Sequence, residues 1–303
     1  MAAIGFFPKI CDAYTDNVYC YICDSISKVT ALVTFALGEI LMYAGVFGAV
    51  LCIIFSFLLI FLKKKERYRK FCTAYLKTML MALVITVFVY MPTWFIPFRG
   101  TVLGEGDVNK RTEFTNEELA VLFKYTVDGA NAAAEEIEIG ADGTVEFPSE
   151  DEIQKMSVEA MQSISGEFPR LEGFYPPVKT ALCSDILEYM GIGGYNYPYT
   201  MEPTHNKYFE PMYQALLDSH ELAHHKGYYK ENEANFLSML ALSKSDDPYL
   251  RLSGYYEMHW YLIDDFYEDA LYYVGDEPML NERVEFIINA LVSLQTLTNT
   301  RAL

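Results

Sequence analysis

Basic residues are scarce in the last two thirds of this 303-residue chain. Residues 100–303 carry 13 lysines and arginines against 36 aspartates and glutamates, whereas residues 1–99 carry 10 against 5. Nucleic-acid binding needs a basic surface that neutralises phosphates, and the C-terminal part offers none. The composition therefore argues against nucleic acid as a partner. We interpret the acidity as a source of solubility.

Cysteine is sparse and without a recognisable pattern. The six cysteines include one C-x-x-C pair, Cys20 and Cys23, and a single pair does not indicate a zinc knuckle. Cys183 is the only cysteine after residue 99, so no disulfide framework is expected there. Internal repeats and low-complexity segments are also lacking. Because no charged segment and cleavage site follow Met1, we expect no removable signal peptide.

Two uncharged apolar runs, at residues 41–62 and 78–97, are each long enough to span a bilayer. The strongly basic segment 63–70 lies between them, and the positive-inside rule places it in the cytoplasm. We therefore predict that residues 1–99 form a membrane anchor of two transmembrane helices. Residues 100–303 would form an extracellular domain of a multi-pass cell-membrane protein, with the lipid bilayer as a partner.

Glu39 is the only charged residue between Val29 and Leu62. Its position just before the first apolar run predicts that it lies at the outer membrane interface. A functional carboxylate inside the membrane is the alternative, because ionisable groups within spans often have a function.

The sequence His220-Glu221-Leu222-Ala223-His224 is an HExxH motif. Residues four apart lie on the same face of a helix, so His220 and His224 can bind one metal ion. Glu221 is then placed to act as general base on a zinc-bound water. Apolar residues recur at helical spacing from Phe209 onward, and Gly227 is expected to end this helix. The motif therefore predicts a zinc site with Glu221 as the catalytic residue.

A catalytic zinc needs a third protein ligand. The segment from Glu231 to Asn235 resembles the Glu-x-x-x-Asp segment that supplies this ligand in glutamate-zincin peptidases. That resemblance implies Glu231 as the ligand and Asn235 as a residue that orients a zinc histidine. Glu233 is the alternative third ligand. His225 is not expected to bind the metal, because it points about 100° away from His224 on a helix.

The C-terminal part is predicted to be mainly α, a helical zincin-like domain with a small extended or β element. Capping boxes at Thr115 and Ser149 indicate two helix starts. Further helices are predicted at residues 178–190, 248–274 and 281–298. Turn-forming residues at 191–200 favour extended chain or a hairpin.

Residues 193–201 are the extended segment best placed to bind a substrate backbone beside the zinc helix. Tyr195, Tyr197 and Tyr199 would alternate onto one face of a strand. We predict that this segment borders the active-site cleft. A surface loop whose tyrosines cover the core is the alternative.

The segment from Tyr175 to Glu202, the HELAH core, Gly227 and the stretch from Glu231 to Phe236 together resemble the bacterial family called domain of unknown function 3810. The segment before the first apolar run resembles it as well. The resemblance implies a membrane-anchored protein with an HExxH zinc-peptidase motif. It implies no substrate.

Zinc peptidases also need a group that stabilises the oxyanion formed at the scissile carbonyl. Among the residues outside the motif, His259 is one candidate, and His205, Tyr228 and Tyr229 are others. Together these features predict a membrane-anchored, zinc-dependent metallopeptidase that cleaves a peptide or protein substrate outside the cell, with Zn²⁺ as cofactor. A catalytically silent zinc-binding sensor or scaffold is the alternative.

Overall fold

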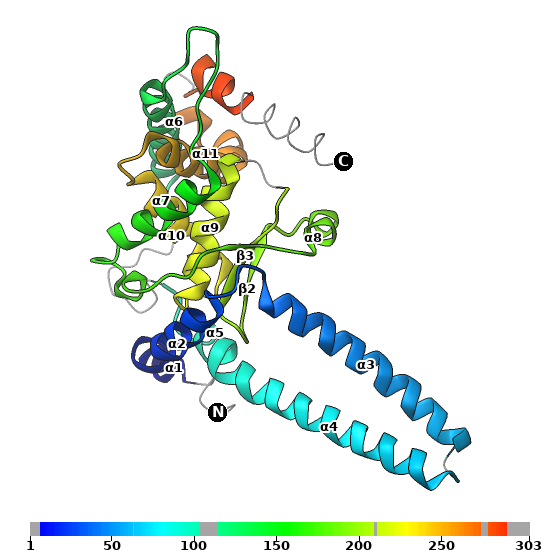
Figure 1. Cartoon of the computed structure of the whole chain (residues 1–303). Coiled ribbons are helices and arrows are strands. Elements are labelled where there is room, and N and C mark those ends of the chain that lie inside the picture. The colour runs from blue at the N-terminus through cyan, green and yellow to red at the C-terminus, as the bar shows by residue number, and fades with distance from the viewer. Residues whose placement is uncertain (1–6, 63, 104–113, 209–210, 274–277, 290–303) are drawn as a thin grey trace.

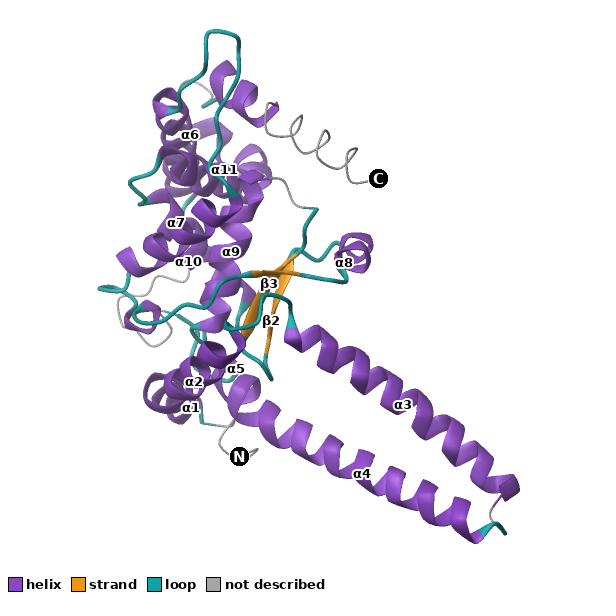
Figure 2. Ribbon diagram, viewed as in Figure 1, coloured by secondary structure: helices purple, strands orange, loops and turns teal. Residues whose placement is uncertain are grey.

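The computed structural model describes residues 7–62, 64–103, 114–208, 211–273 and 278–289. Two long helices project side by side from a helical body (Figure 1), and a small three-stranded sheet lies where they meet it (Figure 2). The mainly helical class with a small β element is therefore confirmed.

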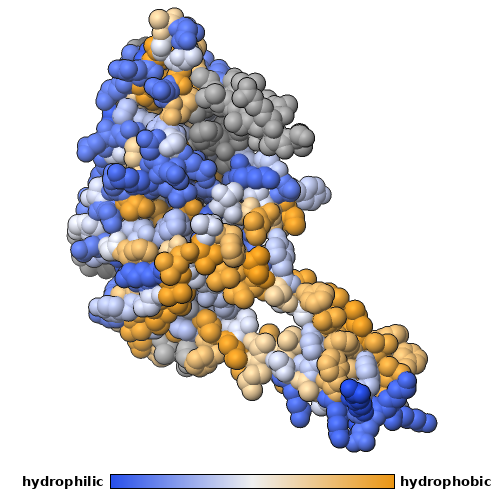
Figure 3. Space-filling view, in the orientation of Figure 1, coloured by the Kyte–Doolittle hydropathy of each residue, from blue (hydrophilic) through white to orange (hydrophobic). Residues whose placement is uncertain are grey.

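The two projecting helices are α3 (Leu37–Leu62) and α4 (Glu66–Tyr90), which continues through η3 (Met91–Phe95) and α5 (Ile96–Phe98). Both are long and apolar enough to cross a membrane. Their apolar side chains are largely exposed, and hydrophilic residues cover their far tips (Figure 3). The two apolar runs predicted from the sequence lie within these helices.

The N-terminal helices α1 (Pro8–Tyr14), η2 (Thr15–Tyr19) and α2 (Cys20–Thr30) pack on the body rather than along the two long helices. Arg170 forms ion pairs with Asp12 at 3.6 Å and with Asp16 at 2.6 Å. The Tyr19 hydroxyl donates to the carbonyl of His225 at 3.0 Å. Residues from both predicted domains therefore build one hydrophobic cluster beside the HExxH helix.

The body consists of α6 (Asn116–Glu136), α7 (Glu150–Ser163), η4 (Pro169–Leu171), α9 (Pro211–His225), α10 (Glu231–Ser243) and α11 (Pro248–Asp265), packed around a common apolar core. Both predicted capping boxes are present, at Thr115 and Ser149. After α11 the chain continues as η5 (Phe266–Ala270) and η6 (Leu271–Tyr273), within the predicted range. A last helix occupies 282–289, and the rest of its predicted range lies outside the described residues.

The sheet has the order β1-β3-β2. Strand β3 (Glu202–His205) pairs in parallel with β1 (Lys179–Thr180) and antiparallel with β2 (Gly194–Tyr197). The extended chain or hairpin predicted at 191–200 is confirmed in part, because β2 is extended and its hairpin partner, β3, lies just beyond the predicted range. The predicted helix at 178–190 is wrong in its first half, because Lys179–Thr180 is a strand and the helix α8 spans only Ser184–Met190.

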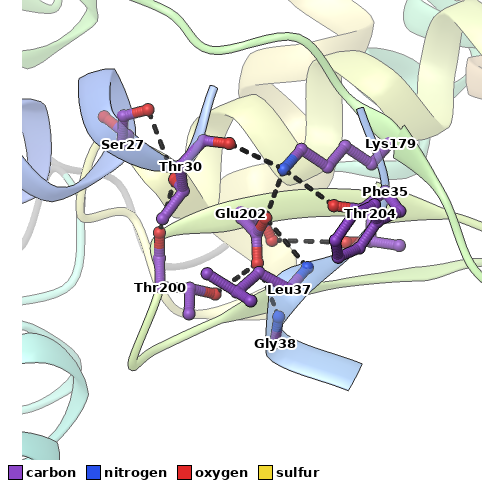
Figure 4. Close-up of polar contacts among 9 residues, drawn as sticks. All are labelled: Ser27, Thr30, Phe35, Leu37, Gly38, Lys179, Thr200, Glu202 and Thr204. Carbon is purple, nitrogen blue, oxygen red and sulfur yellow. Dashed lines mark hydrogen bonds and ion pairs between the residues drawn. The ribbon is translucent and has the colours of Figure 1, made fainter. Parts of the chain in front are cut away.

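Buried polar contacts around Glu202 attach the first long helix to the sheet (Figure 4). The Glu202 carboxylate accepts the backbone N–H groups of Leu37 at 3.1 Å and Gly38 at 2.7 Å, at the start of α3. It also pairs with Lys179, which donates to the carbonyls of Thr30 and Phe35. A carboxylate at a helix N-terminus satisfies free N–H groups and favours the helix dipole.

Glu39 lies one turn into α3 and is fully buried by protein. Its carboxylate accepts the backbone N–H groups of Leu182 at 2.6 Å and Cys183 at 3.0 Å. The interfacial position predicted for Glu39 stays a prediction, and the structure adds that protein surrounds this carboxylate. Glu39 satisfies backbone groups just before α8, because burying an ionised carboxylate requires such partners.

Candidate metal centre

Helix α9 carries both motif histidines on one face. The rings of His220 and His224 lie 4.5 Å apart at an angle of 86°. Gly227 adopts φ +89°, a left-handed conformation that favours glycine, and ends the helix as predicted. The expected first helical residue, Phe209, lies outside the described residues.

The chain turns after Gly227 and brings Glu231, the first residue of α10, over the two histidines. Its carboxylate oxygens lie 3.1 Å from His220 Nε2 and 3.6 Å from His224 Nε2. One donor atom from each of the three residues lies within 4.8 Å of the others. Ligands at ~2.1 Å from a tetrahedral zinc lie about 3.4 Å from one another. The three residues therefore fit a zinc ion by donor type and spacing.

Glu233, the alternative third ligand, lies elsewhere. It is 7% exposed, and its carboxylate accepts the backbone N–H of Leu103 at 2.6 Å. Two residues along a helix point about 200° apart, so Glu231 and Glu233 cannot face the same ion. The structure brings Glu231 to the histidines and not Glu233.

The tautomer of His224 is set by the turn that follows α9. The Nδ1 of His224 lies 2.8 Å from the carbonyl oxygen of Tyr228, which can only accept. Nδ1 therefore carries the proton, and Nε2 presents its lone pair toward Glu231. The ring of Tyr229 stacks on His224, with centroids 5.9 Å apart and planes 13° apart.

Asn235 does not orient a histidine, contrary to the expectation from the resemblance. Its side-chain amide donates to the hydroxyl of Tyr261 from α11. It nevertheless lines the same cavity as His220 and Glu231. We conclude that Asn235 shapes the wall of the site, while backbone of the Gly227 turn orients His224.

Glu221 faces the sheet from α9 and is 3% exposed. Glycine at position 194 makes this possible: a Cβ there would lie 2.9 Å from Glu221 Oε1 and 2.6 Å from the carbonyl oxygen of Thr204. Burial raises the pKa of the Glu221 carboxyl, and the nearby histidines lower it. Its Oε2 atom has no hydrogen-bond partner among the described residues. This carboxylate can accept a proton from a molecule in the cavity.

A cleft of about 590 Å³ lies over these residues. One wall is strand β2, whose outer edge pairs with no strand in the described part of the chain. Of the segment predicted to border the cleft, 193–201, residues 193–196 line it, and Gly194 packs directly on Glu221. The cleft is lined by Trp94, Phe98, Ile192, Gly193, Gly194, Tyr195, Asn196, Tyr213, Leu216, Leu217, His220, Glu221, His224, Tyr229, Glu231, Asn235 and Glu257.

Asn196 is a polar residue of the cleft that the motif does not reveal. It lies on β2 two residues after Gly194, so both face α9. It is 9% exposed, and neither atom of its amide group has a hydrogen-bond partner among the described residues. The tyrosine at 197 faces the other way and packs on Gly38. The alternation of small and polar residues with tyrosines in this strand could have indicated Asn196 from the sequence.

None of the four expected oxyanion groups presents its polar atoms to the cleft. His259 does not line it and packs against Phe123 in a tilted arrangement, at a centroid distance of 4.9 Å. Burial lowers the pKa of His259. The hydroxyl of Tyr229 donates to the carbonyl of Thr93 at 2.9 Å. The Tyr228 ring lies under the guanidinium of Arg170 at 5.3 Å.

His205 is also outside the cleft. Its Nδ1 lies 2.7 Å from Asp218 and its Nε2 3.2 Å from Glu150, so it joins β3 to α9 and α7. Burial lowers the pKa of His205, but the hydrogen bonds to both carboxylates outweigh it and raise the value to about 9. His225 packs against Cys23 on the opposite side of α9, and burial lowers its pKa to about 3.

The fold and the site define a mainly helical protein with two long apolar helices and a His/His/Glu cluster in a cleft beside them. The chain belongs to the family described as "Protein of unknown function (DUF3810)", whose model matches residues 14–283. No curated protein and no solved structure matches it.

Proposed function

We propose that this protein is a membrane-anchored, zinc-dependent metallopeptidase with a zincin-like site that hydrolyses peptide bonds outside the cell. The observation that carries the proposal is the meeting of His220, His224 and Glu231 within 4.8 Å, with the buried Glu221 beside them. The basic segment between the two apolar helices supports the outward orientation of the cleft.

A zinc ion held by this cluster would polarise the scissile carbonyl and lower the pKa of a water molecule. Glu221 accepts the proton of the attacking water and transfers it to the leaving amine. Its burial favours this role, because it raises the pKa of the carboxyl, which helps a group that both accepts and returns a proton.

Strand β2 supplies the binding surface for the substrate. An extended peptide can pair with its open edge through backbone hydrogen bonds, as in other cases of strand addition. Asn196 then offers its amide to a substrate carbonyl from a buried position. Trp94 and Phe98 form apolar walls that restrict water in the cleft.

The test uses the full chain in lipid nanodiscs, with zinc measured by mass spectrometry and hydrolysis measured on fluorescently labelled casein. We expect one zinc per chain, lost in the double variant His220→Ala/His224→Ala. Glu221→Gln should keep zinc and lose hydrolysis by about 10²–10⁴-fold, the usual contribution of a general base. Full zinc content in the double variant would contradict the proposal.

A catalytically silent zinc-binding sensor or scaffold is the second candidate. The observation in its favour is that none of the expected oxyanion groups points into the cleft. This candidate would be favoured if the protein binds zinc but does not hydrolyse casein. In addition, the parent protein should cleave no peptide of a random library faster than Glu221→Gln does.

A further inference from the structure

Helix α8 presents apolar side chains outward. Ile186, Tyr189 and Met190 are 57%, 93% and 61% exposed, and Leu182 just before the helix is 55% exposed. Leu187 is instead buried against the sheet side. A surface helix of a soluble domain normally turns its apolar face inward, and contiguous exposed apolar residues mark an interaction surface.

The acidic residues of α8 bond to the segment that follows β3. Asp185 forms an ion pair with Lys207 at 3.4 Å. Glu188 accepts a hydrogen bond from the side chain of Asn206 at 3.0 Å. The Asp185 side chain remains 76% exposed, so the exposed surface of α8 carries acidic residues beside its apolar side chains.

The start of α8 is fixed at the level of the first turns of α3. The backbone N–H groups of Leu182 and Cys183 donate to Glu39. Tyr43, one turn further along α3, lies beside Cys183. Figure 1 shows α8 next to the end of α3 that joins the body.

The length of the spans locates the membrane surface. A hydrocarbon core of ~30 Å takes about 20 helical residues. Counted back from Leu62, they reach Tyr43. Tyr90 and Trp94 lie near the end of the second apolar run, 78–97. Tyrosine and tryptophan favour the membrane–water interface, so both runs carry interfacial aromatic residues toward their outer ends. The start of α8 lies beside Tyr43 and therefore near this interface.

We propose that α8 docks on the bilayer, with Leu182, Ile186, Tyr189 and Met190 resting between the lipid headgroups and the acyl chains. The occupant is the membrane that α3 and α4 are proposed to cross, because the Glu39 contacts hold the start of α8 beside the first turn of α3. Figure 3 shows apolar surface on the part of the domain nearest this helix.

This docking determines how far the cleft lies from the membrane surface. Trp94, one turn and ~5 Å beyond Tyr90, lines one wall of the cleft, and the chain leaving α8 forms the other wall from Ile192 to Asn196. The cleft therefore opens at the membrane surface. Resting on the proposed function, the substrate class is a polypeptide segment held at that surface, such as the segment of a membrane-anchored protein next to its anchor.

The docking is tested with two matched tryptophan variants of the full chain in phosphatidylcholine nanodiscs. Tyr189→Trp probes α8, and Tyr272→Trp is the control, since both tyrosines are 93% exposed. Tyr272 lies in η6, which packs on α6 at the far end of the body. The tryptophan emission of the parent protein is subtracted from that of each variant. The remaining emission is then compared between ordinary lipid and lipid brominated on the acyl chains.

We expect brominated lipid to quench the added emission of Tyr189→Trp at least twofold and to leave that of Tyr272→Trp unchanged. Equal emission of Tyr189→Trp in both lipids would overturn the docking. A blue-shifted but unquenched emission would do so as well, by placing α8 against protein such as a second copy. The measurement needs neither zinc nor hydrolysis, so its failure is distinct from a failure of the proposed function.

The substrate class has its own measurement. A fluorogenic peptide library is offered to the same nanodiscs either free or on a lipid anchor, and the cleavage rates are compared at equal peptide concentration. We expect the anchored library to be cleaved at least tenfold faster. Equal rates would refute the substrate class and leave the peptidase proposal standing, whereas no cleavage in either form would count against the peptidase proposal itself.

Discussion

Glu231 and Glu233 offer a sharp test of the metal centre, because they lie two residues apart on one helix and have opposite surroundings. The side chain of Glu231 is 77% exposed and contacts both motif histidines. Glu233 is buried and accepts a backbone N–H. The variants Glu231→Gln and Glu233→Gln make the same chemical change in each setting.

Glu231→Gln is expected to change zinc affinity, whereas Glu233→Gln is expected to change only stability. Zinc-finger peptides bind zinc with ~10–16 kcal/mol through four ligands, so one ligand contributes roughly 3 kcal/mol and its loss weakens binding about 100-fold. Glu231→Gln should show this loss, because a neutral amide oxygen is a poor zinc ligand. Glu233→Gln should keep full zinc affinity and lose ~1 kcal/mol of stability, since its hydrogen bond to Leu103 is weakened.

Zinc affinity is measured on the full chain by competition with a fluorescent chelator, and unfolding is followed with and without zinc. At a free zinc concentration of 100 times the parent Kd, binding stabilises the parent by ~2.7 kcal/mol but a variant weakened 100-fold by only ~0.4 kcal/mol. Zinc lost in Glu233→Gln and retained in Glu231→Gln would refute the assignment. Unchanged affinity in both would show that no carboxylate of α10 binds the metal.

Three further predictions address the cleft, its support and its orientation. Gly194→Ala should lower casein hydrolysis about 100-fold and leave the zinc content unchanged, because the added Cβ displaces Glu221 and a misplacement of ~1 Å costs about that much in rate. The control is Gly166→Ala, whose added Cβ meets no atom. Full activity of Gly194→Ala, equal to that of the control, would refute this prediction. His205→Gln should destabilise the protein most below pH 6.5, by roughly 3 kcal/mol at most, and progressively less as pH rises through about 9. The reason is that the raised pKa of His205 makes the folded state hold this proton more tightly than the unfolded state does. A difference in unfolding free energy that stays constant from pH 6 to pH 10 would contradict this prediction. Protease added to intact spheroplasts should remove residues 100–303, and complete protection would reverse the proposed topology.

The parts of the fold that were predictable depend on local signals. Thr115 and Ser149 cap helices because their hydroxyls and the glutamates three residues later satisfy free backbone groups. Gly227 ends α9 because the turn needs a positive φ. The HExxH spacing predicts that His220 and His224 share a face, because it follows from helix geometry alone.

The errors and omissions arise where distant segments meet. Lys179 begins a strand because its ammonium reaches the buried Glu202, a contact that helix propensity does not encode. Glu39 is buried because the chain before α8 needs an acceptor for its N–H groups. Asn235 pairs with a tyrosine of α11 rather than with a histidine. His259 turns toward α6 because packing on Phe123 buries its ring.

The anchor and the metal centre are parts of one structure. Trp94 stacks on Tyr90 and Phe98 at centroid distances of 5.2 and 4.6 Å, which extends an aromatic column from α4 to the cleft. Tyr229 lies 6.0 Å from Trp94 and stacks on His224, so the end of the second long helix supports the ring of a proposed metal ligand. On the other side, Glu202 holds the start of α3 against the strand beside β2. Because both long helices contact the walls of the cleft, we expect its shape to depend on how these helices are held, and the proposed zinc binding and hydrolysis are best measured on the whole chain in lipid.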